Sequence, residues 1–218
     1  MGNNMSAYGA MFDKNNAVAT TINTASEYHA LENQGTGLCS GFAFDAGSNG
    51  AITDTADNGG VLRCTDVAHG LATGDMITLN GMGDAAHNGI TAVTVIGVDT
   101  FDCDNIVYNS IEDTGSWQQG SSLTVGTGGA GIYMISWGAS GSAAVSAKEY
   151  HFECFQNIVA IDGTHKPRTF TGTTIGNFGS PAALVSLAES DIVWCGVENV
   201  TDTTNLTIAD FNLSLVKL

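Results

Sequence analysis

Basic residues are scarce in this sequence of 218 residues. It contains 6 lysines and arginines against 22 aspartates and glutamates, which gives a formal net charge of −16 at pH 7. A nucleic-acid-binding surface needs clustered Lys and Arg side chains that contact phosphates. The composition therefore argues against nucleic acid as a partner.

Long apolar runs are absent as well. No stretch of about 20 apolar residues is present, as a membrane-spanning helix requires. The N-terminus does not have the basic and then apolar pattern of a secretory signal peptide. Membrane is therefore not an expected partner. Apolar residues still make up 43% of the chain, enough to fill a core, so a disordered chain is a poor fit.

The cysteines lack the spacing of a metal site. There are five, with no Cys-x-x-Cys pair and no cluster with histidine, so a structural zinc site is not expected. Most of them sit in apolar, strand-like runs. We interpret them as buried free thiols in a protein assembled in a reducing cytosol. They are Cys39, Cys64, Cys103, Cys154 and Cys195.

Strand signals dominate the chain. β-Branched and aromatic residues alternate with polar ones, and Gly, Asn and Asp separate the runs. A break in the alternation at Asp210 indicates a β-bulge in the last strand. Many short strands with frequent turns predict an all-β, antiparallel sandwich or barrel. The clearest strands are 17–22, 38–44, 132–137, 150–155, 192–197 and 206–218.

A different texture marks residues 60–122. Turn dipeptides such as Gly74-Asp75 and Asn88-Gly89 separate four or five short strands there, and Gly-rich stretches flank the segment. We interpret it as a small β module inserted into a loop of a larger sandwich, since modules whose ends lie close together tolerate such insertion. The sandwich would then comprise residues 1–59 and 123–218.

Catalytic and metal-binding patterns are weak. His69 and His87, together with Asp75 and Asp84, could ligate a metal, but a turn histidine and a solvated loop histidine are the commoner outcome. The acidic residues around Phe101 could hold calcium, although a solvated acidic rim is more usual. Gly138-Ala-Ser140-Gly141 lacks the form of a nucleophile elbow. We predict no catalytic residue, no metal site and no cofactor.

Several motifs resemble the trimeric jelly roll of the tumour-necrosis-factor and complement superfamily. Gly131-Ile-Tyr133-Met-Ile-Ser-Trp137 is similar to its central Gly-x-Tyr strand. Leu187-Ala-Glu-Ser190-Asp191-Ile-Val-Trp194 resembles its Leu-x-x-Gly-Asp segment, with Ser190 in place of Gly, and 211–218 resembles its final strand. Segments 7–11 and 41–45 look like a version common in tailed-phage structural proteins. The insert, with His69-Gly70-Leu71, resembles a small β domain that recurs in phage virion proteins.

This resemblance implies a homotrimer with a jelly-roll fold. Large aromatic side chains would supply both the core and an interface along the three-fold axis. The residues assigned to this trimer interface are Tyr133, Trp137, Phe152, Trp194 and Phe211. Residues Met1 to Lys14 are interpreted as an arm that docks on a neighbouring protein through Tyr8, Met11 and Phe12.

The resemblance also implies a function without catalysis. We expect a bacteriophage virion structural protein, assembled in the bacterial cytoplasm, that decorates the capsid by binding the major capsid protein or another virion protein. The sequence has no coiled coil, collagen repeat or β-helical shaft, which favours a capsid position. The alternative is a tail-associated tip that binds a host receptor or glycan through the loops around Gly81 to Asn88 and Trp117. A small hydrolase is a third, weaker hypothesis.

Overall fold

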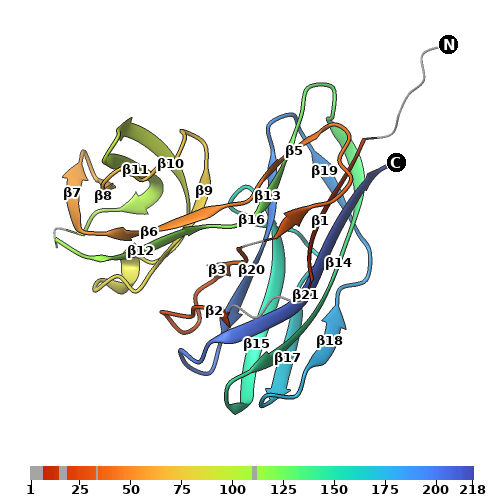
Figure 1. Ribbon diagram of the computed structural model, residues 1–218. Coiled ribbons are helices and arrows are strands. Elements are labelled where there is room, and N and C mark those ends of the chain that lie inside the picture. Colours follow the sequence, from red (N-terminus) through yellow and green to blue (C-terminus); the bar gives the residue numbers. More distant parts are fainter. Residues whose placement is uncertain (1–6, 15–18, 33, 110–111) are drawn as a thin grey trace.

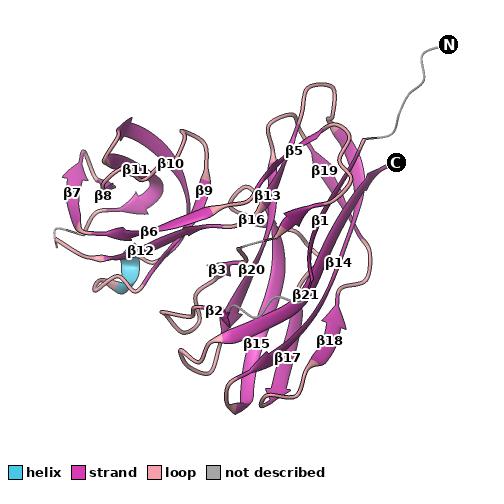
Figure 2. Cartoon of the chain, viewed as in Figure 1, coloured by secondary structure: helices cyan, strands magenta, loops and turns pink. Residues whose placement is uncertain are grey.

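The computed structural model describes residues 7–14, 19–32, 34–109 and 112–218, and these form an all-β protein (Figures 1 and 2). One short 3-10 helix, Ala85–His87, is the only helix among them. None of the described helical residues forms an element long and apolar enough to span a bilayer. The predicted fold class, an antiparallel β-sandwich, is confirmed.

Two sheets form the sandwich at the right of Figure 1. The first sheet has the order β18-β14-β21-β1-β4, with β19 beside β14 and β2 beside β21. After β13 the chain crosses between the sheets repeatedly, as in a jelly roll. The strands of the first sheet are β1 (Tyr8–Lys14), β2 (Ala19–Thr20), β4 (Gly35–Thr36), β14 (Gly131–Ala143), β18 (Gly176–Gly179), β19 (Ala183–Leu187) and β21 (Leu206–Lys217).

The second sheet faces the first across the main core. Its order is β16-β15-β20-β13-β5, with β17 beside β15 and β3 beside β20. Its strands are β3 (His29–Ala30), β5 (Phe42–Asp45), β13 (Ser122–Val125), β15 (Ser146–Gln156), β16 (Val159–Ala160), β17 (Lys166–Thr171) and β20 (Ile192–Asn199).

A third sheet forms the separate module at the left of Figure 1, with its own apolar core. Its order is β6-β12-β9-β10-β11-β8-β7. The boundary predicted at residue 60 lies inside this sheet, because 48–58 form two of its strands. Asp54–Asn58 gives no strand signal in the sequence because its residues are mostly polar, and the structure leaves most of them exposed. The strands are β6 (Ser48–Ile52), β7 (Asp54–Asn58), β8 (Val61–Thr65), β9 (Met76–Asn80), β10 (Gly89–Gly97), β11 (Thr100–Val107) and β12 (Gly115–Gln119).

The module leaves and re-enters the sandwich at one point. Asp45, the last residue of β5, is the antiparallel partner of Ser122, the first residue of β13. The chain between them folds as the third sheet. An insertion between paired strand ends leaves the pairing of β5 with β13 intact, which explains why the sandwich accommodates a module at this position.

The five aromatic residues predicted to line a trimer interface are buried in the interior of one folded chain, so their assignment to the interface is corrected. Tyr133, Trp137, Phe152 and Phe211 belong to the core between the two sandwich sheets, and none is more than 4% exposed. The Trp137 ring stacks on Phe211, and its Nε1 donates to the Thr164 carbonyl oxygen. Inward-facing side chains of a two-sheet sandwich pack against the opposite sheet, so they cannot contact another copy.

Trp194 has a separate role at the base of the module. It is 2% exposed, stacks on Phe155 with ring centroids 4.5 Å apart, and donates from Nε1 to the Asn157 carbonyl oxygen. These two rings and Ala30 form a small apolar cluster, against which Met76 and Ile90 of the module pack. Trp194 therefore joins the sandwich to the module.

Two further details of the strands concern the sequence motifs. The β14–β21 register shifts so that Ser140 pairs with Asp210 and Gly141 with Ile208, which confirms the predicted bulge in the last strand. Ser190 has a φ of 71°. It thus adopts the left-handed conformation that glycine adopts most readily, at the position where the resembled motif has glycine.

One pair of cysteines differs from the prediction of free thiols. Cys154 on β15 and Cys195 on β20 are directly opposed, with Cα atoms 4.1 Å apart, and form a disulfide. Cys39, Cys64 and Cys103 are free. The two paired cysteines are 41 residues apart, so their opposition arises from strand pairing and is not visible in the spacing. Because two cysteines are paired, cysteine usage no longer supports the expectation that the protein is assembled in a reducing compartment.

Replacing Trp194 with alanine is expected to lower the free energy of unfolding by roughly 3–5 kcal/mol, because it removes a buried aromatic side chain and leaves a cavity. Urea denaturation followed by circular dichroism measures the change. Ile175→Ala is the control, since Ile175 is 60% exposed and lies outside the apolar surface described below, and its truncation is expected to cost less than about 1 kcal/mol. A loss below that limit for Trp194→Ala would mean that the indole does not join the two parts.

Two deletions are expected to differ. Replacing Ala46–Ser121 with Asn-Gly joins Asp45 directly to its partner Ser122 through a two-residue hairpin turn, so the sandwich should fold. Deleting 61–122 removes Ser122 and leaves β6 and β7 without their sheet partners, so that variant should aggregate. Cooperative unfolding on calorimetry identifies the folded variant. If both deletions behave alike, the module does not begin and end between Asp45 and Ser122.

Candidate functional site

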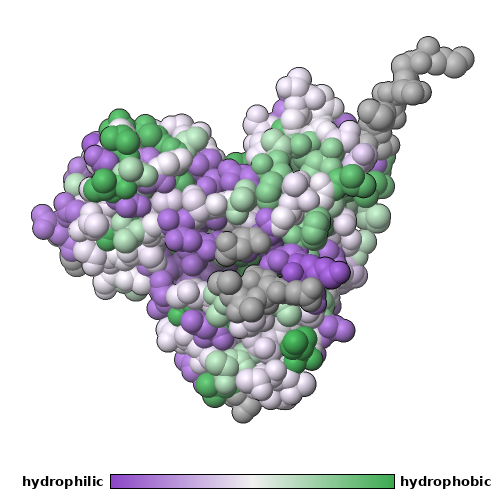
Figure 3. Space-filling view, in the orientation of Figure 1, coloured by the Kyte–Doolittle hydropathy of each residue, from purple (hydrophilic) through white to green (hydrophobic). Residues whose placement is uncertain are grey.

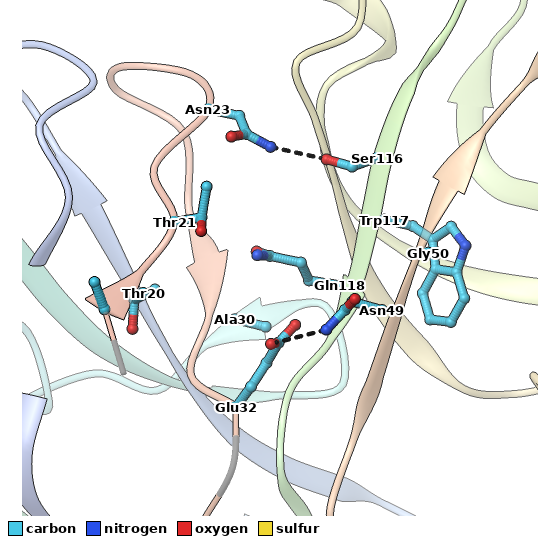
Figure 4. Close-up of a pocket in the computed structure, with 11 residues that line it drawn as sticks. Thr20, Thr21, Asn23, Ala30, Glu32, Asn49, Gly50, Ser116, Trp117 and Gln118 are labelled. Carbon is cyan, nitrogen blue, oxygen red and sulfur yellow. Dashed lines mark hydrogen bonds between the residues drawn. The ribbon is translucent and has the colours of Figure 1, made fainter. Parts of the chain in front are cut away.

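A polar pocket lies where the module meets the sandwich. Its volume is about 380 Å³, within the range of about 300–1,000 Å³ that small-molecule sites occupy. Segment 19–32 of the sandwich forms one wall, and β6 and β12 of the module form the other (Figure 4). In Figure 3 hydrophilic residues gather between the two parts. We call this cavity the junction pocket; it is lined by Ala19, Thr20, Thr21, Asn23, Ala30, Glu32, Asn49, Gly50, Ser116, Trp117 and Gln118.

Strand alternation decides which side chains of β12 reach the junction pocket. Ser116 and Gln118 point toward it, whereas the Trp117 ring points to the other side of the strand (Figure 4). That ring is 1% exposed, and its Nε1 donates to Asp66 Oδ2 over 2.7 Å. A Cβ atom on Gly50 would lie 2.6 Å from this nitrogen, so only glycine fits beside the indole. Trp117 therefore supports the wall from behind.

Segment 19–32 is fixed to the module by polar contacts. Asn23 Nδ2 donates to Ser116 Oγ over 2.9 Å, and the backbone N–H of Gly81 donates to Thr24 Oγ1 over 2.8 Å. Asn49 Nδ2 donates to Glu32 Oε2 over 3.1 Å. These bonds connect residues far apart in the sequence, and they hold the two walls in place.

Two polar atoms of the junction pocket have no hydrogen-bond partner among the described residues. They are Glu32 Oε1 and Gln118 Oε1, and both are shielded from solvent. Burial raises the pKa of the Glu32 carboxyl, while the hydrogen bond from Asn49 opposes this shift. Buried acceptors without donors cost free energy, so such atoms in a cavity indicate a place where a ligand donates hydrogen bonds.

His29 stands behind this wall and is completely buried. Its Nε2 accepts a 2.9 Å hydrogen bond from the backbone N–H of Asn23, so this nitrogen carries no proton. Its Nδ1 lies 2.9 Å from the Glu27 carbonyl oxygen and donates to it. Burial lowers the pKa of His29 to about 4, and the bond to Glu27 opposes this shift. The neutral ring thereby fixes the position of Asn23 at the pocket.

A second candidate surface lies on the outer face of the first sheet. Four exposed apolar side chains stand in one row across β19, β14, β21 and β1, because Leu184 pairs with Met134, Met134 with Val216, and Val216 with Tyr8. Their exposed fractions lie between 39% and 66%. Ile132 and Leu218 extend this apolar row at one end, and both are exposed. Contiguous exposed apolar residues of this kind are typical of protein interaction sites.

The predicted docking arm is a strand over most of its described length. Residues 8–14 form β1, which pairs with β21 on one side and β4 on the other. Met11 is completely buried in the core, so its assignment to docking is wrong. Tyr8 and Phe12 are 40% and 49% exposed on the outer face. Residues 1–6 of the arm lie outside the described residues.

The histidines and aspartates weighed as metal ligands serve local structure. His69 bonds to the backbone of Gly97 and Leu71. His87, expected on a solvated loop, is completely buried, and its Nδ1 lies 3.1 Å from Asp113. Asp102, from the expected acidic rim, is buried and pairs with Arg63 over 2.7 Å. The described residues contain no group of three or more His, Cys, Asp or Glu able to hold a metal.

The loop expected to bind a receptor uses its backbone donors internally. Asp113, which no sequence motif marks, accepts hydrogen bonds from the backbone N–H groups of Gly83 and Asp84. Burial raises the pKa of the Asp113 carboxyl, but these hydrogen bonds, the one from Thr114 and the contact with His87 together outweigh burial and lower it. Asp113 therefore stabilises this loop, and Trp117 is buried beneath it in the module core.

No protein-family model matches the sequence, and a search of curated proteins finds no match to it.

Acidification is expected to destabilise the fold through His29. With a pKa of about 4 in the folded state and about 6.5 when unfolded, the unfolded chain binds the proton more tightly between these values. Stability is therefore complete above pH 6.5 and falls as the pH drops, by about 2 kcal/mol at pH 5. Urea denaturation at pH 5.0–7.5 measures the slope.

The His29→Gln variant should lose this component of the slope, while His165→Gln should keep it, because His165 is exposed. An unchanged slope in His29→Gln would show that His29 is not held neutral in the folded protein.

Proposed function

We propose that this chain is a structural protein of a tailed-bacteriophage virion, which forms a homotrimer and decorates the capsid surface. The observation that carries the proposal is the apolar row of Leu184, Met134, Val216 and Tyr8 on the first sheet. Its side chains are exposed in the single chain. Burying such a row between copies stabilises an assembly by about 25 cal/mol for each Å² removed from water.

The resemblance to trimeric jelly rolls, together with this row, supports a three-fold arrangement. In a closed ring of three copies each chain contacts both neighbours, so the row would lie along the three-fold axis where all three copies meet, and closure leaves no apolar edge over. The proposed interface thus replaces the five buried aromatics with residues of the opposite strand face. Tyr8 belongs to it, so part of the segment assigned to docking on another protein serves self-association instead.

Binding by shape explains how such a protein acts. A trimer placed on a three-fold or quasi-three-fold site of the capsid adds contacts between neighbouring copies of the major capsid protein, and no covalent step is needed. The strongly acidic chain would repel packaged nucleic acid, which suits a position on the outside of the particle. In this proposal the protein is not an enzyme, and its location is the virion.

The tail-associated tip is retained as the second proposal because of the junction pocket, and not because of the loop around Gly81 to Asn88. Copy number separates the two positions. Capsid decoration requires many copies on each particle, seen by quantitative gel electrophoresis of purified virions and by electron microscopy. A tail tip requires few copies and binding of the protein to host cells.

Placing a charge in the apolar row is expected to dissociate the trimer. Sedimentation velocity of the wild-type protein should give a mass three times the 22.4 kDa of one chain. Met134→Glu should sediment as a monomer with an unchanged far-ultraviolet spectrum, because a carboxylate cannot be buried in an apolar interface without a partner.

Val159→Glu is the matched control, since Val159 is an exposed apolar residue of the second sheet, and it should remain trimeric. A wild-type protein that is monomeric at micromolar concentration, or a Met134→Glu variant that stays trimeric, would contradict the proposed interface.

A further inference from the structure

We propose that the junction pocket binds a neutral, polyhydroxylated ligand of about the size of one sugar ring. This inference does not depend on the trimer or on the location of the protein, because both walls of the pocket belong to one chain. Three observations carry it: the chemistry of the lining, the two acceptors without partners, and the fixed geometry of the walls.

The lining excludes anions first. None of the lining residues that the structure describes is basic, and one, Glu32, is acidic. A phosphate or carboxylate ligand would approach this carboxyl without a compensating charge, in a chain whose net charge is −16. Anionic ligands are therefore disfavoured by electrostatic repulsion.

Uncharged hydrogen-bonding groups make up most of the polar lining. Hydroxyls come from Thr20, Thr21 and Ser116, and amides from Asn23, Asn49 and Gln118. Asn23 already bonds to Ser116 and Asn49 to Glu32, but these groups keep further donor and acceptor capacity, which an apolar ligand would leave without water or partner at a cost in free energy. A ligand with several hydroxyls both donates and accepts, so it satisfies groups of both kinds.

Glu32 and Gln118 give the pocket its selectivity. Their unpartnered oxygens need donors, and Glu32 Oε2 is already held by Asn49, so the free Oε1 is fixed in position. A hydroxyl donating to this carboxylate makes a charge-assisted bond, which is stronger than a neutral one. A cationic amine would find only this one carboxyl. No aromatic face is available to it, because the Trp117 ring points away from the cavity.

The two walls are already bonded to each other without a ligand, so filling the pocket requires only small side-chain movements that open the Glu32 and Gln118 oxygens to it. The bonds Asn23–Ser116 and Asn49–Glu32 connect the walls at the pocket, and the bond between Gly81 and Thr24 connects them nearby. His29 fixes the backbone of Asn23 from behind. A pocket held in this way loses little conformational entropy when it is filled, which favours binding of a small ligand.

Saturation-transfer NMR and calorimetric titration with D-glucose, D-galactose, N-acetyl-D-glucosamine and L-rhamnose test the proposal. At least one of these sugars should bind saturably, with a dissociation constant near about 1 mM. Ethanolamine hydrochloride and inorganic phosphate serve as the cationic and anionic probes. Absence of saturable binding by all four sugars, or tighter binding of ethanolamine or phosphate, would overturn the proposal.

Two variants locate the binding. Glu32→Gln keeps the shape but removes the charged acceptor, and should weaken sugar binding about ten-fold or more. Glu189→Gln is the matched control on an exposed turn outside the pocket, and should bind as the wild type does. Equal affinity in Glu32→Gln and the wild type would place any sugar binding elsewhere and overturn the assignment.

Thr21→Phe provides a second test that leaves the buried contacts untouched. Thr21 is exposed and its side chain is directed into the cavity (Figure 4), so a phenyl ring there should fill the pocket and abolish binding without unfolding the chain. Circular dichroism verifies the fold of each variant. Retained sugar binding in a folded Thr21→Phe variant would refute the site.

Discussion

The two-residue alternation of β14 and β21 is the constraint on which the sandwich depends. Tyr133, Ile135 and Trp137 point inward from β14, and Leu213 and Leu215 point inward from β21, so these strands supply the centre of the core. The same alternation places Met134 and Val216 outward, where they meet Leu184 and Tyr8 in one row. A core face and an apolar outer face are thus produced by the same stretch of chain.

This arrangement explains which parts of the fold the sequence could predict. The strands at 132–137, 150–155, 192–197 and 206–218 carry strong alternation and are present, as is the bulge near Asp210. The faces of β14 could not be assigned, because Ile132 and Met134 are as apolar as Tyr133 and Trp137. The aromatic residues were candidates for the interface because their side chains are large. Large side chains also fill a protein core, and all five are buried.

The module boundary and the junction pocket could not be predicted from the sequence, for a different reason. Asp54–Asn58 has no apolar alternation, and only its pairing with β8 makes it a strand. The pocket combines segment 19–32 with residues 49–50 and 116–118, which are brought together by topology alone. Glu32 and Gln118 carry no motif that marks them. Their significance is visible only when a buried oxygen is found without a donor.

The insertion of the module between Asp45 and Ser122 has a mechanical consequence. Two chain connections leave the sandwich at neighbouring positions, so once the contacts of segment 19–32 and of Trp194 with the module are broken, a pull on the module is shared by β5 and β13. That load reaches β20 through the β13–β20 pairing and would separate those strands one hydrogen bond after another. Under load the chain would therefore yield first at the root of the module, while the sheet that carries the apolar row stayed intact.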